Sequence, residues 1–277
     1  MPVRALLHYA LEVPDQTKAE TFYRTFGLVD APGRSDAVQL RPPAVGRACT
    51  LLYGGPRKRL HHLAFGAPDG GFWTRDPDGN LVNVRPEAAP QPPADPPLAV
   101  NAPGHITREV VRGVPEQRPE PRPRKLGHVL FFTPDVQRQI EFYTGVLGLK
   151  LSDRVKNIIA FLRCSTDHHN VAFLTSKGPG FHHASFQVGS IDEIAVGAAR
   201  MRDAGWQLGW GMGRHVIGSN YFYYTRDPWG SFVEYYHDLD FIPEQCAWAP
   251  RDFPEEDSLY FWGPPPPPEF TENVELV

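Results

Sequence analysis

The sequence carries the same series of motifs twice, and this duplication limits the folds that the chain can adopt. The block LLHYALEVPDQTKAETFYRTFGL near the N-terminus matches KLGHVLFFTPDVQRQIEFYTGVLGL after position 124. Two further pairs follow in the same order, LHHLAF with FHHASF and TRDPDGNLVNV with TRDPWGSFVEY. Repeated blocks in one order indicate a repeated structural unit. We therefore expect two copies of one domain.

A proline-rich segment separates the two copies. Thirty prolines occur in the 277 residues, and they are dense between positions 86 and 124, where they favour an extended connector over helices and central strands. A second cluster, WGPPPPPEF, predicts a rigid arm lying over the protein, with a ligand for a polyproline-reading domain as the alternative. We expect four segments: a domain over residues 1–85, a linker over 86–124, a second domain over 125–240, and a tail over 241–277 that covers the second domain's pocket.

The second copy predicts an α+β fold. HVLFFT is a short apolar run typical of a buried strand, and Pro134-Asp135 marks the start of a helix. Each half of this copy has the order strand–helix–strand–strand–strand, without the glycine-rich turn of a dinucleotide-binding unit. In the first copy, the stretch between His62 and Asn83 is too short for a second helix, so we expect that copy to be shortened.

Composition and charge exclude several classes of function. The net charge is −4, the pI is near 6.3, and no block of like charge stands out, which argues against nucleic acid or an anionic membrane as a partner. No apolar run has the length of a membrane span, and the N-terminus lacks the features of a signal peptide. Three distant cysteines, Cys49, Cys164 and Cys246, fit a reducing compartment. We expect a cytoplasmic protein.

Two histidines and one glutamate predict a metal site in the second copy. His128 and His183 begin equivalent strands of its two halves, and Glu234 lies on the last strand among bulky aromatic residues. A buried carboxylate needs a compensating partner. Two imidazoles and one carboxylate from separate strands form the facial triad that suits ferrous iron and dioxygen chemistry. Taken singly, a histidine in an apolar strand is more often a core residue than a ligand, and a strand glutamate is more often at a sheet edge. Taken together, the residues alone leave both interpretations open.

A family resemblance supports the metal interpretation. LGHVLFFTPDVQRQIEFYTGVLGL, HHASFQV and GRHVIGSNYFYYTRDPWGSFVEYY together resemble the vicinal-oxygen-chelate superfamily, and within it the two-domain type I extradiol ring-cleaving dioxygenases. That family has a histidine, a tyrosine nine residues later and a ligand glutamate ten further on, which here are His215, Tyr224 and Glu234. The resemblance implies two tandem vicinal-oxygen-chelate domains built from paired βαβββ modules. It further implies Fe(II), with Mn(II) equally compatible with the donor types, a catechol and dioxygen as substrates, and a homo-oligomer.

The resemblance also implies a catalytic histidine shortly before the second metal ligand. CSTDHHNVAF offers His168 and His169. We assign the role to His169, which lies at the head of a strand fourteen residues before His183. On this analogy His169 stabilises dioxygen and acts as the general acid and then the base. We expect His168 to be a neighbour on the surface.

Further site residues are assigned by the same analogy. His215 and Tyr224 would hydrogen-bond the substrate oxygen and favour its anionic form, although ordinary strand packing also accounts for them in a stretch rich in tyrosine. Trp210 and Phe222 would supply aromatic pocket walls. The sequence therefore predicts extradiol cleavage of a substituted catechol to a muconate semialdehyde-type product. A metal-dependent isomerase or lyase on the same scaffold and a metal-free binding protein are the alternatives.

The first copy departs from the ligand pattern. His8 and His62 keep two of the ligand positions, but Asn83 replaces the carboxylate. Asparagine offers only a neutral carbonyl oxygen, so this position lacks the negative charge that offsets desolvation of a divalent cation. We expect the first copy to be structural and to bind no metal.

Overall fold

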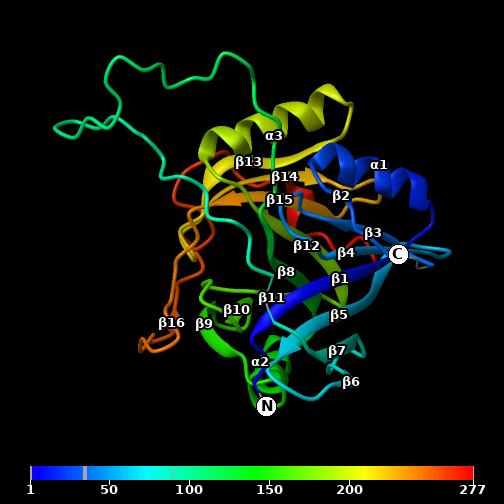
Figure 1. Ribbon diagram of the computed structural model, residues 1–277. Coiled ribbons are helices and arrows are strands. Elements are labelled where there is room, and N and C mark those ends of the chain that lie inside the picture. The colour runs from blue at the N-terminus through cyan, green and yellow to red at the C-terminus, as the bar shows by residue number, and fades with distance from the viewer. Residues whose placement is uncertain (1, 34–35, 89, 277) are drawn as a thin grey trace.

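Two mixed β-sheets form the framework of the protein. The computed structural model describes residues 2–33, 36–88 and 90–276. In the first sheet the strand order is β2-β3-β4-β1-β5-β7-β6, and in the second it is β13-β14-β15-β12-β8-β11-β10-β9-β16 (Figure 1). The strands of the first sheet are β1 (Ala5–Val13), β2 (Val29–Asp30), β3 (Val38–Arg41), β4 (Thr50–Gly54), β5 (Arg59–Ala67), β6 (Phe72–Arg75) and β7 (Leu81–Pro86). The strands of the second sheet are β8 (Lys125–Thr133), β9 (Lys150–Val155), β10 (Ile159–Arg163), β11 (Val171–Thr175), β12 (Gly180–Gln187), β13 (Leu208–Arg214), β14 (Tyr221–Arg226), β15 (Phe232–His237) and β16 (Arg251–Asp252).

Three α-helices accompany the sheets in the described part of the chain: α1 (Gln16–Phe26), α2 (Val136–Gly145) and α3 (Ile191–Asp203). Helices α1 and α2 begin at equivalent caps, where Asp15 and Asp135 accept a hydrogen bond from the backbone N–H three residues later. In the second sheet, β8-α2-β9-β10-β11 and β12-α3-β13-β14-β15 are two βαβββ modules. Their first strands pair antiparallel at the centre, and each also pairs in parallel with the last strand of its own module. The predicted α+β class and paired modules are confirmed.

The first sheet has the same centre with fewer elements around it. Strands β1 and β5 pair antiparallel, and β4 and β7 flank them in parallel. Between β5 and β6, residues 68–71 connect the strands directly, without the helix that α3 supplies in the second copy. The absence of this helix accounts for the shorter spacing between the motifs of His62 and Asn83 in the first copy.

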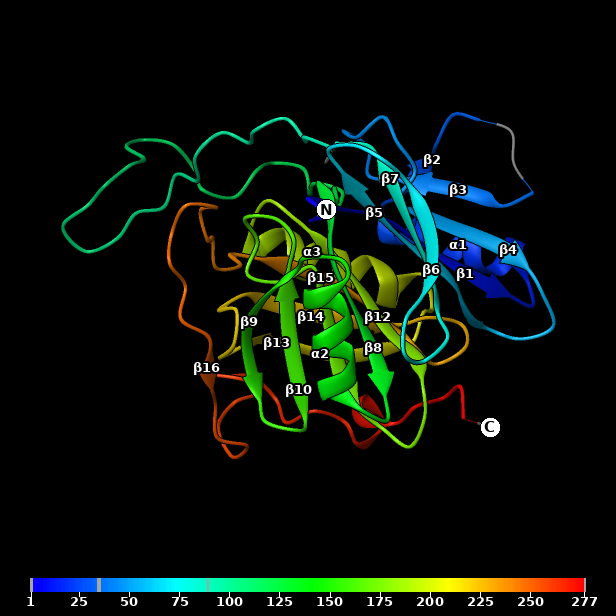
Figure 2. The ribbon, with the colours of Figure 1, turned by 90° about the horizontal axis from the view of Figure 1, so that it is seen from below.

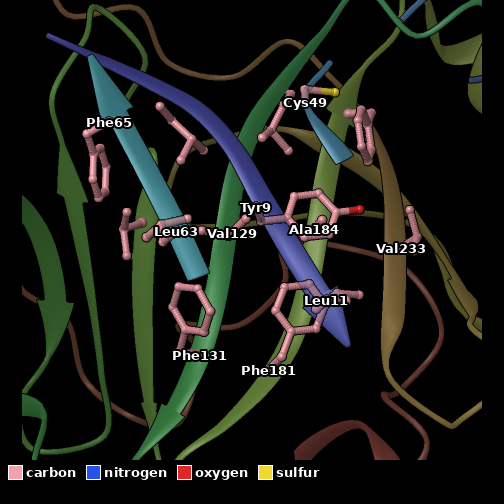
Figure 3. Close-up of a cluster of buried hydrophobic side chains, with 14 of the residues drawn as sticks. Tyr9, Leu11, Cys49, Leu63, Phe65, Val129, Phe131, Phe181, Ala184 and Val233 are labelled. Carbon is pink, nitrogen blue, oxygen red and sulfur yellow. The ribbon is translucent and has the colours of Figure 1, made fainter. Parts of the chain in front are cut away.

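A continuous hydrophobic core joins the two copies. Tyr9 of β1 stacks on Phe181 of β12 with ring centroids 5.4 Å apart, and both lie in the cluster drawn in Figure 3. Phe26 of α1 stacks on Tyr235 of β15 at 3.7 Å, and the Tyr235 hydroxyl donates to the Phe26 carbonyl. Each such aromatic side chain contributes on the order of 2 kcal/mol when fully buried. The first copy thus supplies part of the hydrophobic core against which the second copy packs.

Residues 87–88 and 90–124 connect β7 to β8, and the middle of this long connection stands away from the two sheets (Figures 1 and 2). In its described part the regular pairing is one isolated bridge between Ala102 and His105. At its end Arg124 forms an ion pair with Glu193 of α3. The division of the chain into two domains, a linker and a tail stays a prediction. None of the helices in the described ranges is both long and apolar enough to span a membrane.

The C-terminal segment lies against the second sheet and ends on the first copy. Strand β16 extends the sheet beside β9, and a short 3-10 helix, η1 (Pro268–Thr271), buries Phe270. Near the end, Glu275 forms a 2.6 Å ion pair with Lys58, whose side chain is 3% exposed. The Lys58 ammonium also donates to the Phe181 carbonyl and to the Ser231 hydroxyl. A residue of the first copy therefore anchors the tail.

Replacing Glu275 with glutamine should destabilise the protein, because the Lys58 ammonium would stay buried without its anionic partner. We expect a loss of about 2 kcal/mol in the free energy of unfolding, measured as a lower urea midpoint at unchanged slope. Glu272→Gln is the matched control, since Glu272 is exposed. Equal midpoints for the two variants would contradict the anchoring role.

Candidate metal centre and pocket

Strand register aligns the candidate metal ligands across the second sheet. Ser185 of β12 lies opposite His128 of β8 on one side and opposite Glu234 of β15 on the other. Glu234 is in turn opposite Tyr224 of β14. Side chains opposite each other in register project from the same face of a sheet, as does His183, two residues before Ser185. The duplicated strand order thus brings residues that are far apart in the sequence onto one face.

The structure brings His128, His183 and Glu234 together in the buried interior. Their ligand atoms all lie within 4.8 Å of one another. Glu234 is 0% exposed, and its Oε2 lies 3.1 Å from His128 Nε2 and 3.6 Å from His183 Nε2. The other carboxylate oxygen accepts from the amide of Asn220 at 3.2 Å.

The donor atoms fit a divalent cation. His183 Nε2 is buried without a hydrogen-bond partner in the described chain, although it points at a carboxylate. Burial lowers the pKa of His183 well below its usual value, and the neighbouring His182 and His128 lower it further. A neutral imidazole has a free lone pair for a metal. Two such nitrogens and one carboxylate oxygen are the donor set of an open ferrous site.

The two adjacent histidines of the CSTDHHNVAF block have different surroundings. His169 borders the same cavity as the candidate ligands, and its ring centroid is 4.1 Å from that of His128. His168 is 0% exposed, and its Nε2 lies 2.8 Å from Asp153 Oδ2. The expectation that His168 is a surface neighbour is wrong, because the chain folds it inward against a buried carboxylate.

His215 and Tyr224 form a hydrogen-bonded pair beside the candidate ligands. His215 Nδ1 lies 2.7 Å from the Leu259 carbonyl, to which it must donate, so its Nε2 accepts from the Tyr224 hydroxyl at 3.0 Å. Burial raises the pKa of Tyr224 well above its usual value, with Glu234 adding to the effect. Burial also lowers the pKa of His215. At neutral pH the pair is therefore a protonated phenol and a neutral imidazole.

These residues open onto an apolar cavity of about 300 Å³. The tail supplies part of its wall through Glu255, Leu259 and Phe270. None of the described lining residues is a lysine or an arginine. The remaining apolar wall comes from the first module and from the loop before β14, through Leu130, Val155, Ile158, Ile159, Phe161, Leu174 and Ile217.

Trp210 and Phe222 do not line this cavity, in contrast to the sequence prediction. Phe222 stacks on His215 with centroids 4.0 Å apart, and Trp210 stacks on Tyr224 at 5.7 Å. Trp210 Nε1 donates to the Pro264 carbonyl of the tail. Strand alternation puts Phe222 on the same face as Tyr224, but it does not show how far along the sheet the cavity extends. Both aromatic side chains pack against His215 and Tyr224 on the side away from the cavity lining.

Sequence reasoning missed Asn220 and the apolar wall. Asn220 is 1% exposed, lines the cavity and donates to Glu234. Its place four residues before Tyr224, in the stretch that carries the family pattern, was a usable signal. The wall residues of β9 and β10 carry no such signal, because alternating apolar residues are common to all half-buried strands.

The equivalent position in the first copy has a different arrangement. His8 Nε2 and His62 Nε2 lie 2.8 Å apart, and burial lowers their pKa values to about 3 and about 4. Asn83 Oδ1 accepts from Arg85 Nε at 2.6 Å. Trp73 lies opposite Asn83, as Tyr224 lies opposite Glu234. The asparagine oxygen is thus engaged by a guanidinium, whose charge repels a cation.

Comparison with known proteins agrees with this geometry. The model of the Glyoxalase/Bleomycin resistance protein/Dioxygenase superfamily matches residues 125–235. The chain is 42% identical over 302 residues to metapyrocatechase 2 of Cupriavidus necator, covering 99% of this chain and 93% of that protein. Among solved structures, the Mn(II)-bound glyoxalase of Novosphingobium aromaticivorans aligns with a TM-score of 0.78 at 23% identity, over 97% and 94% of the two chains. Homoprotocatechuate 2,3-dioxygenase of Brevibacterium fuscum aligns at 0.74 and 19%, over 98% and 93%. These two structures share the fold.

Metal binding should depend on Glu234, the one anionic member of the candidate ligand set. Glu234→Ala should retain less than about a tenth of the wild-type iron, because two neutral imidazoles hold a divalent ion weakly. Metal analysis of the purified, folded variant checks this. Glu193→Ala is a control for removing another buried carboxylate, since Glu193 pairs with Arg124 away from the site. Near-stoichiometric iron in Glu234→Ala would exclude Glu234 as a ligand.

The first copy should contribute nothing to iron binding. His8→Ala combined with His62→Ala should leave iron per folded chain and kcat per iron unchanged, because Arg85 and the neutral Asn83 disfavour a cation there. His128→Ala, the equivalent of His8→Ala in the second copy, should lose iron. Loss of half the metal in the double variant, or two irons per wild-type chain, would contradict the assignment.

Proposed function

Because the chain belongs to the glyoxalase/bleomycin resistance protein/dioxygenase superfamily, and within it to the extradiol catechol dioxygenases, we propose that His128, His183 and Glu234 hold ferrous iron for ring cleavage. The reaction opens a catechol with dioxygen next to its diol and gives a muconate semialdehyde-type product. The observation that carries the proposal is the buried two-histidine-one-carboxylate group, whose two histidines line an apolar cavity. When bound there, ferrous iron supplies Lewis acidity and one-electron chemistry for catechol and dioxygen.

Tyr224 and His215 orient the substrate oxygen in this proposal. Because the Tyr224 phenol keeps its proton, it can turn its hydrogen from His215 Nε2 toward an anionic catechol oxygen. The stacked Trp210 and Phe222 hold the two rings in place. A donor directed at the anionic form favours that form inside a site where water is scarce.

His169 handles a proton in the same cavity. Burial lowers its pKa well below the usual value, and His128, His168, His183 and His215 add to the effect. The ring is therefore neutral before reaction and can accept a proton from a catechol hydroxyl. Once it holds this proton, the ring can act as the general acid that the family resemblance implies, and after returning the proton to the product side it is again a base.

The cavity wall supports a catechol with an apolar substituent. A carboxylated side chain would meet no lysine or arginine among the described lining residues, which include the acidic Glu255. Burying a charge without a partner is costly, whereas an alkyl or aryl group would contact Val155, Ile159 and Leu174. We therefore assign alkyl- or aryl-substituted catechols as the substrate class.

The proposal also includes a compartment, the cytoplasm, and an oligomeric state. Three free cysteines, of which Cys246 is exposed, support a reducing cytoplasm. The proposed assembly is a homo-oligomer, as the family resemblance implies. Size-exclusion chromatography with light scattering checks the oligomeric state, and a monomeric mass would contradict the proposed homo-oligomer.

Anaerobic loading with Fe(II), addition of a catechol and admission of air test the function. A yellow ring-fission product is expected, and kcat/KM should be about 10- to 100-fold higher for 3-alkylcatechols than for 3,4-dihydroxyphenylacetate. Glu255→Gln should raise kcat/KM for the carboxylated catechol alone. Glu256→Gln, one residue away and outside the cavity lining, is the control. No coloured product from any catechol would favour the isomerase or lyase alternative.

A further inference from the structure

A hydrogen-bonded chain of three buried side chains leads away from the cavity. His169 Nδ1 lies 3.1 Å from His168 Nδ1, and His168 Nε2 lies 2.8 Å from Asp153 Oδ2. The exposed fractions of the three residues are 3%, 0% and 3% in the order His169, His168, Asp153. Of the three, His169 alone borders the cavity.

The far end of the chain is held by the tail. The backbone N–H of Arg251 in β16 donates to Asp153 Oδ1 at 2.7 Å, which leaves Oδ2 for His168. On the other side, the Ser152 hydroxyl donates to the His168 carbonyl at 2.5 Å. Trp248 Nε1 donates to the Ser152 carbonyl. The positions of Asp153 and His168 are thus determined by neighbours on both sides.

The acceptor at the end of the chain determines where each proton lies. A carboxylate can only accept, so His168 Nε2 carries a hydrogen and donates it to Asp153. When the His168 ring is neutral, its Nδ1 is an acceptor and His169 Nδ1 is the donor to it. The remaining nitrogen of His169, Nε2, has no hydrogen and keeps its lone pair for the cavity.

The same arrangement recurs at the adjacent histidines of β12. His182 Nε2 lies 2.6 Å from the Phe270 carbonyl, which can only accept, and His182 Nδ1 lies 2.7 Å from His183 Nδ1. By the same reasoning His183 carries its hydrogen on Nδ1. Its Nε2 is left with a lone pair, in agreement with the lack of a hydrogen-bond partner at that atom within the described chain.

We propose that Asp153 and His168 are positioning residues that hold His169 in the tautomer with an unprotonated Nε2. The inference rests on the proposed function, since it assigns His169 the lone pair that removes a proton from the catechol hydroxyl. The proton moves from the hydroxyl to His169 Nε2, and its return to product restores the starting tautomer. Asp153 and His168 contact neither the substrate cavity nor the candidate metal ligands.

Asp153→Asn tests the inference because it changes the acceptor with little change in shape. The Arg251 N–H keeps the amide oxygen on its side, so the amide nitrogen faces His168 Nε2 and donates to it. His168 then carries its hydrogen on Nδ1 and donates to His169, whose own hydrogen moves to Nε2. We expect kcat to fall roughly 10- to 100-fold, while iron content stays unchanged and KM stays within about twofold.

Long-range proton–nitrogen correlation spectra of the metal-free protein read the tautomers directly, with the His169 signals assigned from His169→Phe. In the wild type, His169 should carry its hydrogen on Nδ1; in Asp153→Asn it should carry it on Nε2. The His183 tautomer should be the same in both proteins, which makes it an internal control. Ser152→Ala removes the hydrogen bond to the His168 carbonyl without changing the acceptor at His168 Nε2, so His169 should keep its hydrogen on Nδ1 in that variant.

Three results would overturn the inference: a wild-type His169 protonated on Nε2, an unchanged His169 tautomer in Asp153→Asn, or an unchanged kcat in that variant. The wild-type spectrum decides the first point even where a variant fails to fold. In a His168→Phe background, Asp153→Asn should have no further effect on kcat, because the two residues act through one chain. Absence of ring cleavage in the wild type would contradict the proposed function, whereas the spectra of the metal-free protein test the tautomer independently.

Discussion

The burial of the Glu234 carboxylate is the constraint on which the rest of the site depends. A carboxylate without solvent is stable only beside a positive charge or several donors. The aligned strands surround it with two imidazoles, an amide and a phenol, of which only the amide of Asn220 is an unconditional donor. These groups leave the negative charge of Glu234 without a neutralising positive charge, and a bound divalent cation would supply it. The apolar cavity beside it strengthens every electrostatic interaction, because little water competes there.

The tail completes the polar environment of the site through its backbone. The carbonyl of Leu259 accepts from His215, and the carbonyl of Phe270 accepts from His182. The N–H of Arg251 donates to Asp153 behind His168. Backbone groups cannot change their donor or acceptor character, so each one determines which nitrogen of a nearby imidazole holds a hydrogen. The segment that supplies part of the cavity wall thereby also determines the hydrogen positions on the rings beside it.

Repeated motifs were sufficient to predict the duplicated scaffold, because they report strand order. The family resemblance was needed to single out His128, His183 and Glu234, which the structure brings together. Sequence reasoning was wrong about His168 and about the depth of Trp210 and Phe222. Both errors have one cause: local alternation shows which face of a strand a residue occupies, but not which distant segment covers it. The tail covers those residues here, and its contacts join positions 50 to 100 residues apart. The hydrogen-bonding role of Asn220 was open to inference from its neighbours, whereas the wall from β9 and β10 was not.

The ion pair between Lys58 and Glu275 has a consequence for how the two halves of the gene can diverge. The first copy has Asn83 where the second has a carboxylate, yet its lysine anchors the segment that lines part of the other copy's cavity. The residues of the first copy are then constrained by the packing and the anchoring that they provide, and not by metal binding of their own. We expect His8 and His62 to be replaced among relatives by other side chains that fit the buried space, while the lysine and its acidic partner change only together.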